Sequence, residues 1–356
     1  MPLLARTPRS LSPRIREVAT RSVAALPRRA WAATLVLVIA LAACTSAGGS
    51  PGTADASLAA SPAAEPGAAD AACDSGVFPG WPIAGQVTTS GIVPVLASSE
   101  KLVGASRLLF VLVDEHNRPI ADEDLQVEIG FFDLCADPAT PTEVVAPGFA
   151  WGIVGQHAFY VATPTLARPG PWGAAVAVRD PATGVTTGAK LQFTASEGGH
   201  GPRVGDAAPP VATPTLADVG GDVRRISTDT DPEPAFYETS LVDALAAQEP
   251  FVLAFVTPAF CTSAQCGPTI DVLKAAVRAA PIRVVAVEPY ELVYEDGRLK
   301  PVYQGDSFVP VEAATAYGIP TEPWLFVVDA SGTITGSFEA VVGEQELADA
   351  IRAVSR

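Results

Sequence analysis

The chain carries two cysteines five positions apart, at a place where thiol chemistry is favoured. Cys261 and Cys266 lie in the string Phe-Cys-Thr-Ser-Ala-Gln-Cys-Gly-Pro (260–268), directly after the apolar run 251–256. That run predicts a buried strand, and the residues after the cysteines predict a helix. The partial positive charge and free N–H groups of a helix N-terminus favour the thiolate form of a cysteine held there. A thiolate attacks disulfides, and a second nearby thiol resolves the mixed disulfide that forms.

Two interpretations of the helix start leave the attacking cysteine open. If Thr262 caps the helix and Gln265 completes a capping box, Cys261 lies just outside the N-terminus and is the nucleophile. If the helix begins with Pro268 at its first position, Cys266 lies at the terminus instead. We favour Cys261 as the nucleophile and Cys266 as the resolving thiol. A static disulfide between them is the structural alternative.

Residues 223–356 alternate predicted helices and strands. Ser240 is a candidate helix cap. Besides the strand at 251–256, the pattern predicts a helix over 269–279, a strand over 282–287, a helix near 310–317, strands over 324–329 and 333–338, and a helix over 344–354. A longer polar segment, residues 291–307, interrupts the series. The resulting order, β-α-β and then α-β-β-α, indicates an α/β domain.

The region 205–356 resembles the thioredoxin-like superfamily. The string Tyr-Gly-Ile-Pro-Thr-Glu-Pro-Trp (317–324) is similar to the segment in which a cis-proline faces the cysteines, and Pro323 takes that position. Residues 205–210, Gly-Asp-Ala-Ala-Pro-Pro, are similar to a segment of peroxiredoxins and related extracytoplasmic proteins. The resemblance implies a thioredoxin fold and disulfide exchange at Cys261 and Cys266 without a cofactor. It also implies that Pro323 helps to dock an extended substrate.

The sequence departs from that family in several ways. Four residues separate the cysteines where thioredoxins have two, and the buried acid expected near Ala254 is absent. The spacing resembles atypical two-cysteine peroxiredoxins, but Pro258 replaces their active-site threonine, which disfavours a peroxidase. A cysteine pair with a distant histidine is similar to copper-delivering proteins of the Sco type. His116, His157 and His200 all precede the C-terminal domain, so we expect no metal site.

The first 44 residues are identified as a lipoprotein signal peptide. Residues 1–43 contain seven arginines and one acid, and the apolar segment 30–43 is too short to span a bilayer comfortably. It ends in Leu-Ala-Ala-Cys (41–44), which resembles a bacterial lipobox, so Cys44 is predicted to carry lipid. An uncleaved anchor and an ordinary signal peptide are the alternatives. We expect the mature protein at the extracytoplasmic face of the cell membrane, in a compartment that permits disulfides.

The rest of the chain is acidic. The formal charge is −16, and because the first 43 residues contribute +6, the remainder carries −22. Such a surface argues against nucleic-acid binding. The expected partners are extracytoplasmic protein thiols or disulfides and, through the lipid anchor, the membrane.

Two segments of simple composition flank a predicted β domain. Residues 45–73 are almost all small or polar and predict a disordered tether. Residues 198–222 are rich in Gly, Pro and Thr and predict a linker to the thioredoxin-like domain at 223–356.

Residues 74–197 predict an all-β sandwich. Apolar or alternating runs at 108–113, 125–129, 157–161, 172–178 and 191–193 are separated by turn residues. The string Arg-Pro-Gly-Pro-Trp-Gly (168–173) before a strand resembles immunoglobulin-like modules of bacterial envelope lipoproteins. Cys73 and Cys135 are predicted to form a structural disulfide, with two free thiols as the alternative.

Two functions from different classes fit these features. One is a membrane-anchored, extracytoplasmic thiol–disulfide oxidoreductase that uses the Cys261/Cys266 pair. The other is a non-catalytic envelope lipoprotein whose thioredoxin fold is a scaffold and whose β domain binds a partner. The reduction potential of the pair discriminates them, because structural disulfides fall below roughly −300 mV.

Overall fold

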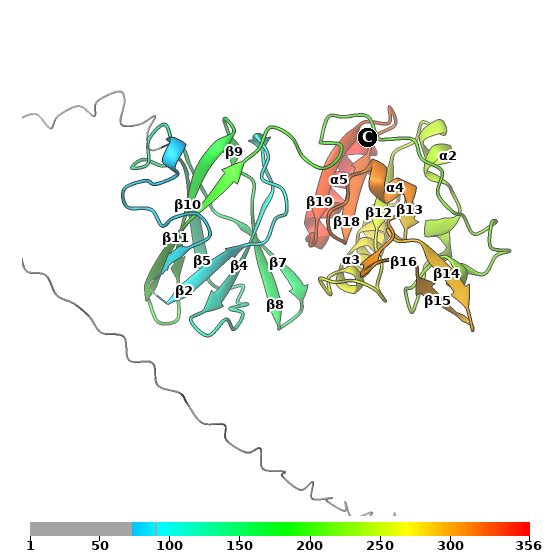
Figure 1. The fold of residues 1–356 in the computed structure, drawn as a ribbon. Helices are drawn as coiled ribbons and strands as arrows, with labels where there is room; N and C mark the ends of the chain where they lie inside the picture. Colours follow the sequence, from blue (N-terminus) through cyan, green and yellow to red (C-terminus); the bar gives the residue numbers. More distant parts are fainter. Residues whose placement is uncertain (1–72, 90) are drawn as a thin grey trace, which may run out of the picture. The chain divides into compact units, whose positions relative to one another are not determined.

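The computed structural model describes residues 73–89 and 91–356, which fall within one unit of the chain (Figure 1). The predictions for the signal peptide at 1–44, for lipid on Cys44 and for the tether, apart from Cys73 at its end, lie outside the described residues. Among the described residues, no helix is long and apolar enough to cross a bilayer.

The first part of the described chain consists of antiparallel strands. They are β1 (Val87–Thr89), β2 (Ile92–Leu96), β3 (Gly104–Ala105), β4 (Leu108–Asp114), β5 (Gln126–Asp133), β6 (Glu143–Val145), β7 (Gly148–Ile153), β8 (His157–Ala162), β9 (Thr165–Leu166), β10 (Gly170–Arg179) and β11 (Thr186–Ala195). One sheet has the order β1-β11-β10-β5-β6 and the other β2-β4-β8-β7, while β3 pairs with β9. Each predicted run overlaps one of these strands, and the two sheets enclose a shared core.

That core follows from the two-residue repeat of strands. Leu108, Phe110 and Leu112 of β4 are fully buried on one side, and Ile129 and Phe131 of β5 are buried on the other. Burying a side chain of this size contributes about 1.5–3 kcal/mol. The alternation therefore fixes which face of each sheet points inward.

The structure joins Cys73 and Cys135 in a disulfide, with their Cα atoms 5.4 Å apart. Both cysteines pack against a small apolar cluster that includes Trp81 and Phe132, whose rings meet edge to face. The disulfide thus ties the start of the described chain to the end of β5.

The second part of the chain mixes helices and strands. Its helices are α2 (Leu241–Ala246), α3 (Cys266–Ala279), α4 (Glu312–Ala316) and α5 (Glu344–Val354), with short 3-10 turns η1 (Val223–Arg225) and η2 (Pro234–Tyr237). Its strands are β12 (Phe251–Phe255), β13 (Arg283–Val287), β14 (Leu292–Glu295), β15 (Arg298–Pro301), β16 (Tyr303–Gln304), β17 (Ser307–Phe308), β18 (Trp324–Val328) and β19 (Ile334–Glu339).

The main sheet of this domain has the order β13-β12-β18-β19. β12 runs parallel to β13 and antiparallel to β18, which is antiparallel to β19. All five residues of β12 are buried, because both faces of the sheet are covered. Val252 and Ala254 face the core that contains α3 and α5, and Leu253 and Phe255 face the core that contains α2 and α4. This is why the run reads as continuously apolar rather than alternating.

Three local predictions differ from the structure. Ser240 occupies the N-cap of α2, but its hydroxyl accepts from the N–H of Thr213, and Thr213 Oγ1 in turn accepts from Leu241. The predicted linker is integrated from residue 205 onward, since Ala208 is buried and bonds to the backbone of Gly332. The predicted polar segment at 291–307 is not irregular but forms two hairpins, β14–β15 and β16–β17.

Polar contacts join the β sandwich to the C-terminal domain within the described unit. The Arg107 guanidinium bonds to the Glu346 carboxylate at 2.9 Å and to the carbonyl of Val341 at 2.7 Å. Glu339 accepts from the backbone N–H of Ser99. Glu339 is the last residue of β19. Glu346 lies in the first turn of α5, where its negative charge also suits the helix dipole.

Candidate functional site

The predicted redox pair lies where β12 gives way to α3. Cys261 and Cys266 form a disulfide in the structure, with their Cα atoms 6.0 Å apart. Helix α3 begins at Cys266, with Gln265 as its N-cap residue and Pro268 within the first turn. Proline is tolerated there because the first N–H groups have no partner inside a helix. The helix therefore begins earlier than the predicted residue 269, because the first turn accepts Gly267 and Pro268.

Neither version predicts the cap residue correctly, although Cys266 does lie at the N-terminus of α3, as the second version expects. Thr262 does not cap α3, and Pro268 is not its first residue. The side chain of Gln265 makes no capping bond. Instead the N–H of Cys266 donates to Sγ of Cys261 at 3.2 Å. The sulfur of Cys261 thus occupies the place that a capping oxygen usually fills at a helix N-terminus.

The two cysteines differ sharply in exposure. Cys261 is partly exposed, whereas Cys266 is 0% exposed and packs at the start of α3. An incoming thiol or disulfide can therefore reach the sulfur of Cys261 but not that of Cys266. Sγ of Cys261 also lies 3.4 Å from Ser263 Oγ, but the Ser263 hydroxyl donates its hydrogen to the carbonyl of Glu322, so the N–H of Cys266 is the polar hydrogen that faces a developing negative charge.

The loop between the cysteines is held by Glu322, a residue that sequence analysis did not single out. The buried carboxylate of Glu322 accepts from the N–H and hydroxyl of Thr262, at 2.7 and 3.0 Å, and from the hydroxyl of Tyr290, at 2.6 Å. The carbonyl of Glu322 accepts from Ser263 Oγ at 2.8 Å. Burial and the bond to Glu322 raise the pKa of Tyr290, which keeps this hydroxyl protonated as a donor.

Pro323 lies next to this anchor. It is buried at the start of β18, and the Glu322–Pro323 peptide bond is cis in the structure. Because Glu322 binds the cysteine loop directly, the structure brings Cys261, Cys266 and Pro323 to one site. The signal that could have identified Glu322 is its position, an acid directly before the proline that the resemblance places beside the cysteines.

A cluster of aromatic rings borders the exposed cysteine. Phe308 lies at the centre, with ring centroids 6.0 Å from Phe260, 4.9 Å from Tyr290 and 5.1 Å from Tyr303. The β16–β17 hairpin brings Tyr303 and Phe308 to this position, and Tyr303 is 59% exposed. The cluster gives the surroundings of Cys261 an apolar character.

A buried acid lies directly after the strand next to β12. Glu288 follows β13 and is 9% exposed. Burial raises the pKa of Glu288 to about 7, in spite of the 2.6 Å bond that it accepts from the N–H of Thr228. Thr228 Oγ1 in turn accepts from the N–H of Ala259, two residues before Cys261. Two hydrogen bonds through Thr228 thus connect Glu288 to the backbone just before Cys261.

The described residues contain no group of three or more His, Cys, Asp or Glu side chains placed to hold a metal ion. His116 and His157 lie in the β domain, and His200 lies in the segment that follows it. No histidine of the described chain is thus placed in the domain that carries the cysteine pair.

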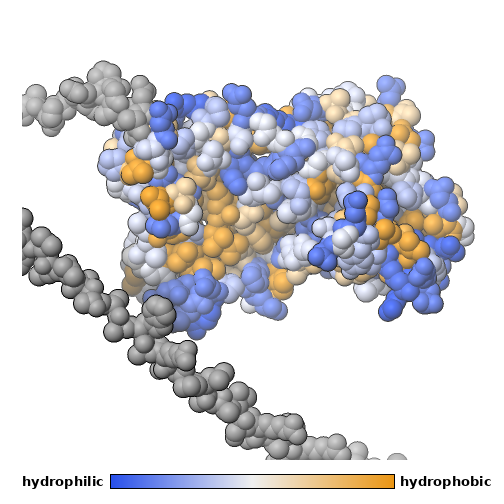
Figure 2. Space-filling model, viewed as in Figure 1, coloured by the Kyte–Doolittle hydropathy of each residue, from blue (hydrophilic) through white to orange (hydrophobic). Residues whose placement is uncertain are grey.

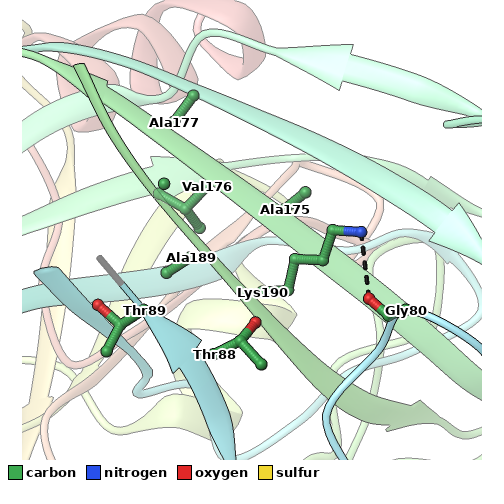
Figure 3. A pocket seen from close by; sticks show the side chains of 9 residues that line it. Gly80, Thr88, Thr89, Ala175, Val176, Ala177, Ala189 and Lys190 are labelled. Atoms are coloured by element: carbon green, nitrogen blue, oxygen red, sulfur yellow. Dashed lines mark hydrogen bonds between the residues drawn. The ribbon is translucent and has the colours of Figure 1, made fainter. Parts of the chain in front are cut away.

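The β sandwich has an open hollow of about 520 Å³ on its outer face, lined by Ala175, Ala177, Gly188 and Lys190 among others (Figure 3). Figure 2 shows apolar residues gathered on the face of the β sandwich that is in view. Lys190 bonds to the carbonyl of Gly80 and lies over the ring of Trp81. The hollow is thus lined mostly by small side chains, and its amine, Lys190, makes both of these contacts within the β domain.

Comparison with known proteins does not identify a family for this chain. No family model and no curated protein matches the chain. One solved structure, the soluble domain of PmoD from Methylocystis sp. ATCC 49242 (Rockwell), is 12% identical and covers 31% of this chain and 90% of its own, with a TM-score of 0.18. A likeness that low carries no argument about fold or function.

Proposed function

We propose that this protein is an extracytoplasmic thiol–disulfide oxidoreductase with a thioredoxin-like domain. The observation that carries the proposal is the asymmetry of the pair: the sulfur of Cys261 is reachable and is hydrogen-bonded at the N-terminus of α3, while Cys266 is fully buried behind it. A disulfide that only braces the fold needs neither property. The sheet order β13-β12-β18-β19, with helices on both faces, also supports a thioredoxin-like fold.

The exchange begins when a substrate thiolate attacks Sγ of Cys261. A substrate–Cys261 disulfide forms, the Cys261–Cys266 bond breaks, and Cys266 leaves as a thiolate at the start of α3, where the N–H groups of the first turn stabilise it. A second substrate thiolate then attacks the substrate sulfur of this mixed disulfide, and Cys261 leaves as a thiolate. The substrate dithiol loses two electrons, the protein pair gains them, and two protons are exchanged with solvent. With a reduced protein and a substrate disulfide the same steps run in reverse.

Glu322 and Tyr290 are positioning residues in this scheme. The carboxylate of Glu322 holds Thr262, and its carbonyl holds Ser263, so the loop keeps Cys261 exposed while Cys266 starts the helix. The test is disulfide exchange of the full chain with dithiothreitol. Turnover that is lost in Cys261→Ala and in Cys266→Ala supports the proposal, and full turnover in the double variant contradicts it.

Anchoring belongs to the same proposal. Lipid on Cys44 would hold the redox domain at the outer face of the membrane, within reach of exported proteins. The support is the lipobox-like string 41–44 behind a basic, apolar segment. Mass spectrometry of the protein from cells tests it: a lipid-modified N-terminal Cys44 is expected, and an unmodified Cys44 peptide would contradict it.

A further inference from the structure

The β sandwich packs against the domain that carries the redox pair. β7 is an edge strand of the sheet β2-β4-β8-β7, and it lies beside α3, the helix that begins at Cys266. Ala150 and Phe159 of the sandwich share an apolar cluster with Val341, which follows β19. The sandwich therefore reaches the side of the domain on which the cysteine loop enters α3.

A close approach between the two is made at Gly152. This residue lies at a β-bulge, the point at which the pairing of β7 with β8 shifts. A Cβ atom there would lie 2.5 Å from Oε1 of Gln265 and 2.7 Å from the ring of Phe159, which is closer than any real contact. The glycine thus allows the Gln265 side chain to lie directly against the backbone of β7. Gln265 is the N-cap residue of α3 and directly precedes Cys266.

Gln265 is held by packing rather than by hydrogen bonds. It is 5% exposed, whereas the three residues before it, 262–264, are exposed. Its Oε1 has no hydrogen-bond partner among the described residues, and its Nε2 makes a long bond, 3.4 Å, to the carbonyl of Ser263. A buried amide with incomplete bonding is unfavourable, so its neighbours must impose its position. One of those neighbours is β7.

The backbone conformation next to Gln265 also has to be imposed. The chain passes from exposed to buried at Ala264, whose φ is 60°. Residues with a side chain rarely adopt this left-handed conformation, and it persists only where the surroundings fix it. On one side of Ala264, Glu322 holds Thr262 and Ser263. On the other side, β7 holds Gln265, so the strained turn lies between one partner from each domain.

We propose that the β sandwich is part of the redox site: through Gly152, β7 positions Gln265 and thereby determines how readily the Cys261–Cys266 disulfide is reduced. A loop that is already fixed loses little conformational entropy when the disulfide closes, so the contact favours the oxidised pair. The inference rests on the proposed function and gives the β domain a role in it. Gly152 and Gln265 are positioning residues, because they act through the cysteines.

The experiment measures the equilibrium of the full chain with dithiothreitol, with the free thiols of each cysteine pair counted by mass spectrometry. Dithiothreitol supplies the two electrons and two protons that convert the disulfide into two thiols, and it becomes the cyclic disulfide. The key variant is Gly152→Ala, whose Cβ needs the space that Gln265 occupies. The matched control is Gly148→Ala in the same strand, whose Cβ would meet the carbonyl oxygen of Val161 at an ordinary 3.9 Å.

Two further variants show whether the effect passes through Gln265. Gln265→Ala removes the side chain that β7 holds and introduces no clash. The double variant Gly152→Ala, Gln265→Ala keeps the contact of the new Cβ with Phe159 but has no Gln265 side chain to displace. Denaturant midpoints establish that each variant is folded.

We expect Gly152→Ala and Gln265→Ala each to shift the equilibrium towards the dithiol by about tenfold, which corresponds to about 30 mV. Gly148→Ala should match wild type, and the double variant should match Gln265→Ala. An unchanged equilibrium in Gly152→Ala or in Gln265→Ala, or an equal shift in Gly148→Ala, overturns the inference. So does a further shift when Gly152→Ala is added to Gln265→Ala, because the effect would then pass through Phe159.

The same samples separate this inference from the proposed function. A wild-type pair that does not exchange with dithiothreitol contradicts both. Exchange in wild type together with an unchanged equilibrium in Gly152→Ala contradicts the role of β7 alone.

Discussion

The backbone N–H of Cys266 donates a hydrogen bond to Sγ of Cys261 over 3.2 Å, so the exposed sulfur caps the helix that begins with its buried partner. When the disulfide opens, the same N–H and the helix terminus stabilise negative charge on Cys261. We therefore expect Cys261 to act as the nucleophile and Cys266 as the resolving thiol. Replacing each cysteine in turn should give a different result.

Replacing Cys266 by alanine should leave a long-lived mixed disulfide on Cys261, because no thiol remains to resolve it. Replacing Cys261 should abolish adduct formation, because the sulfur of Cys266 is buried. Trapping in cells followed by peptide mapping measures both. An adduct found only on Cys266 would reverse this assignment of roles.

The Glu322 anchor should control the order of the loop between the cysteines. Glu322→Ala removes the acceptor of the Thr262 N–H, and losing these buried bonds should cost about 1–3 kcal/mol of stability. Hydrogen exchange at the Thr262 amide should accelerate in Glu322→Ala. In Tyr290→Phe, which leaves the Thr262 bond intact, it should stay slow. Unchanged exchange in Glu322→Ala would show that the carboxylate does not hold the loop.

Glu288 should make the folded state less stable as pH rises. Its pKa is about 7 in the folded protein against an ordinary 4.5, so between these values the folded state binds more protons than the unfolded state. The contribution is fully present below pH 4.5 and is lost as pH rises through 7, by about 3 kcal/mol. Chemical denaturation of wild type and Glu288→Gln at pH 4.5 and pH 8 measures it. Wild type should lose more stability than the variant, and parallel losses would refute the assignment.

The Cys73–Cys135 disulfide should brace the β domain. It closes a loop with a sequence separation of 62, so replacing both cysteines by alanine should cost about 2–4 kcal/mol. The matched control is the Cys261→Ala, Cys266→Ala double variant, whose loop has a separation of 5 and should cost less. Denaturant midpoints compare the two, and a larger loss in the control would contradict this division between a structural and a redox disulfide.

The sequence predicts the main elements of both domains because strong apolar runs such as 251–256 and 324–328 admit few alternatives. The sequence is less informative where tertiary contacts determine the burial and the partners of a side chain. Glu322 reads as an ordinary exposed acid until the loop of Thr262 folds onto it. Glu288 is not identified from the sequence, because the resemblance places the buried acid on β12, whereas Glu288 directly follows the neighbouring β13. The β14–β15 hairpin carries an Asp-Gly turn signal at 296–297 that the polar composition of the segment masked.

The reduction potential of the Cys261–Cys266 pair tests the central claim most directly. It is measured by equilibrating the full chain with dithiothreitol at graded ratios of its reduced and oxidised forms and counting the free thiols by mass spectrometry. An exchangeable pair should titrate above roughly −300 mV, while Cys73–Cys135 stays oxidised in the same samples as an internal reference. A Cys261–Cys266 potential below roughly −300 mV, or reduction of both disulfides together, would show that the pair is structural and contradict an oxidoreductase.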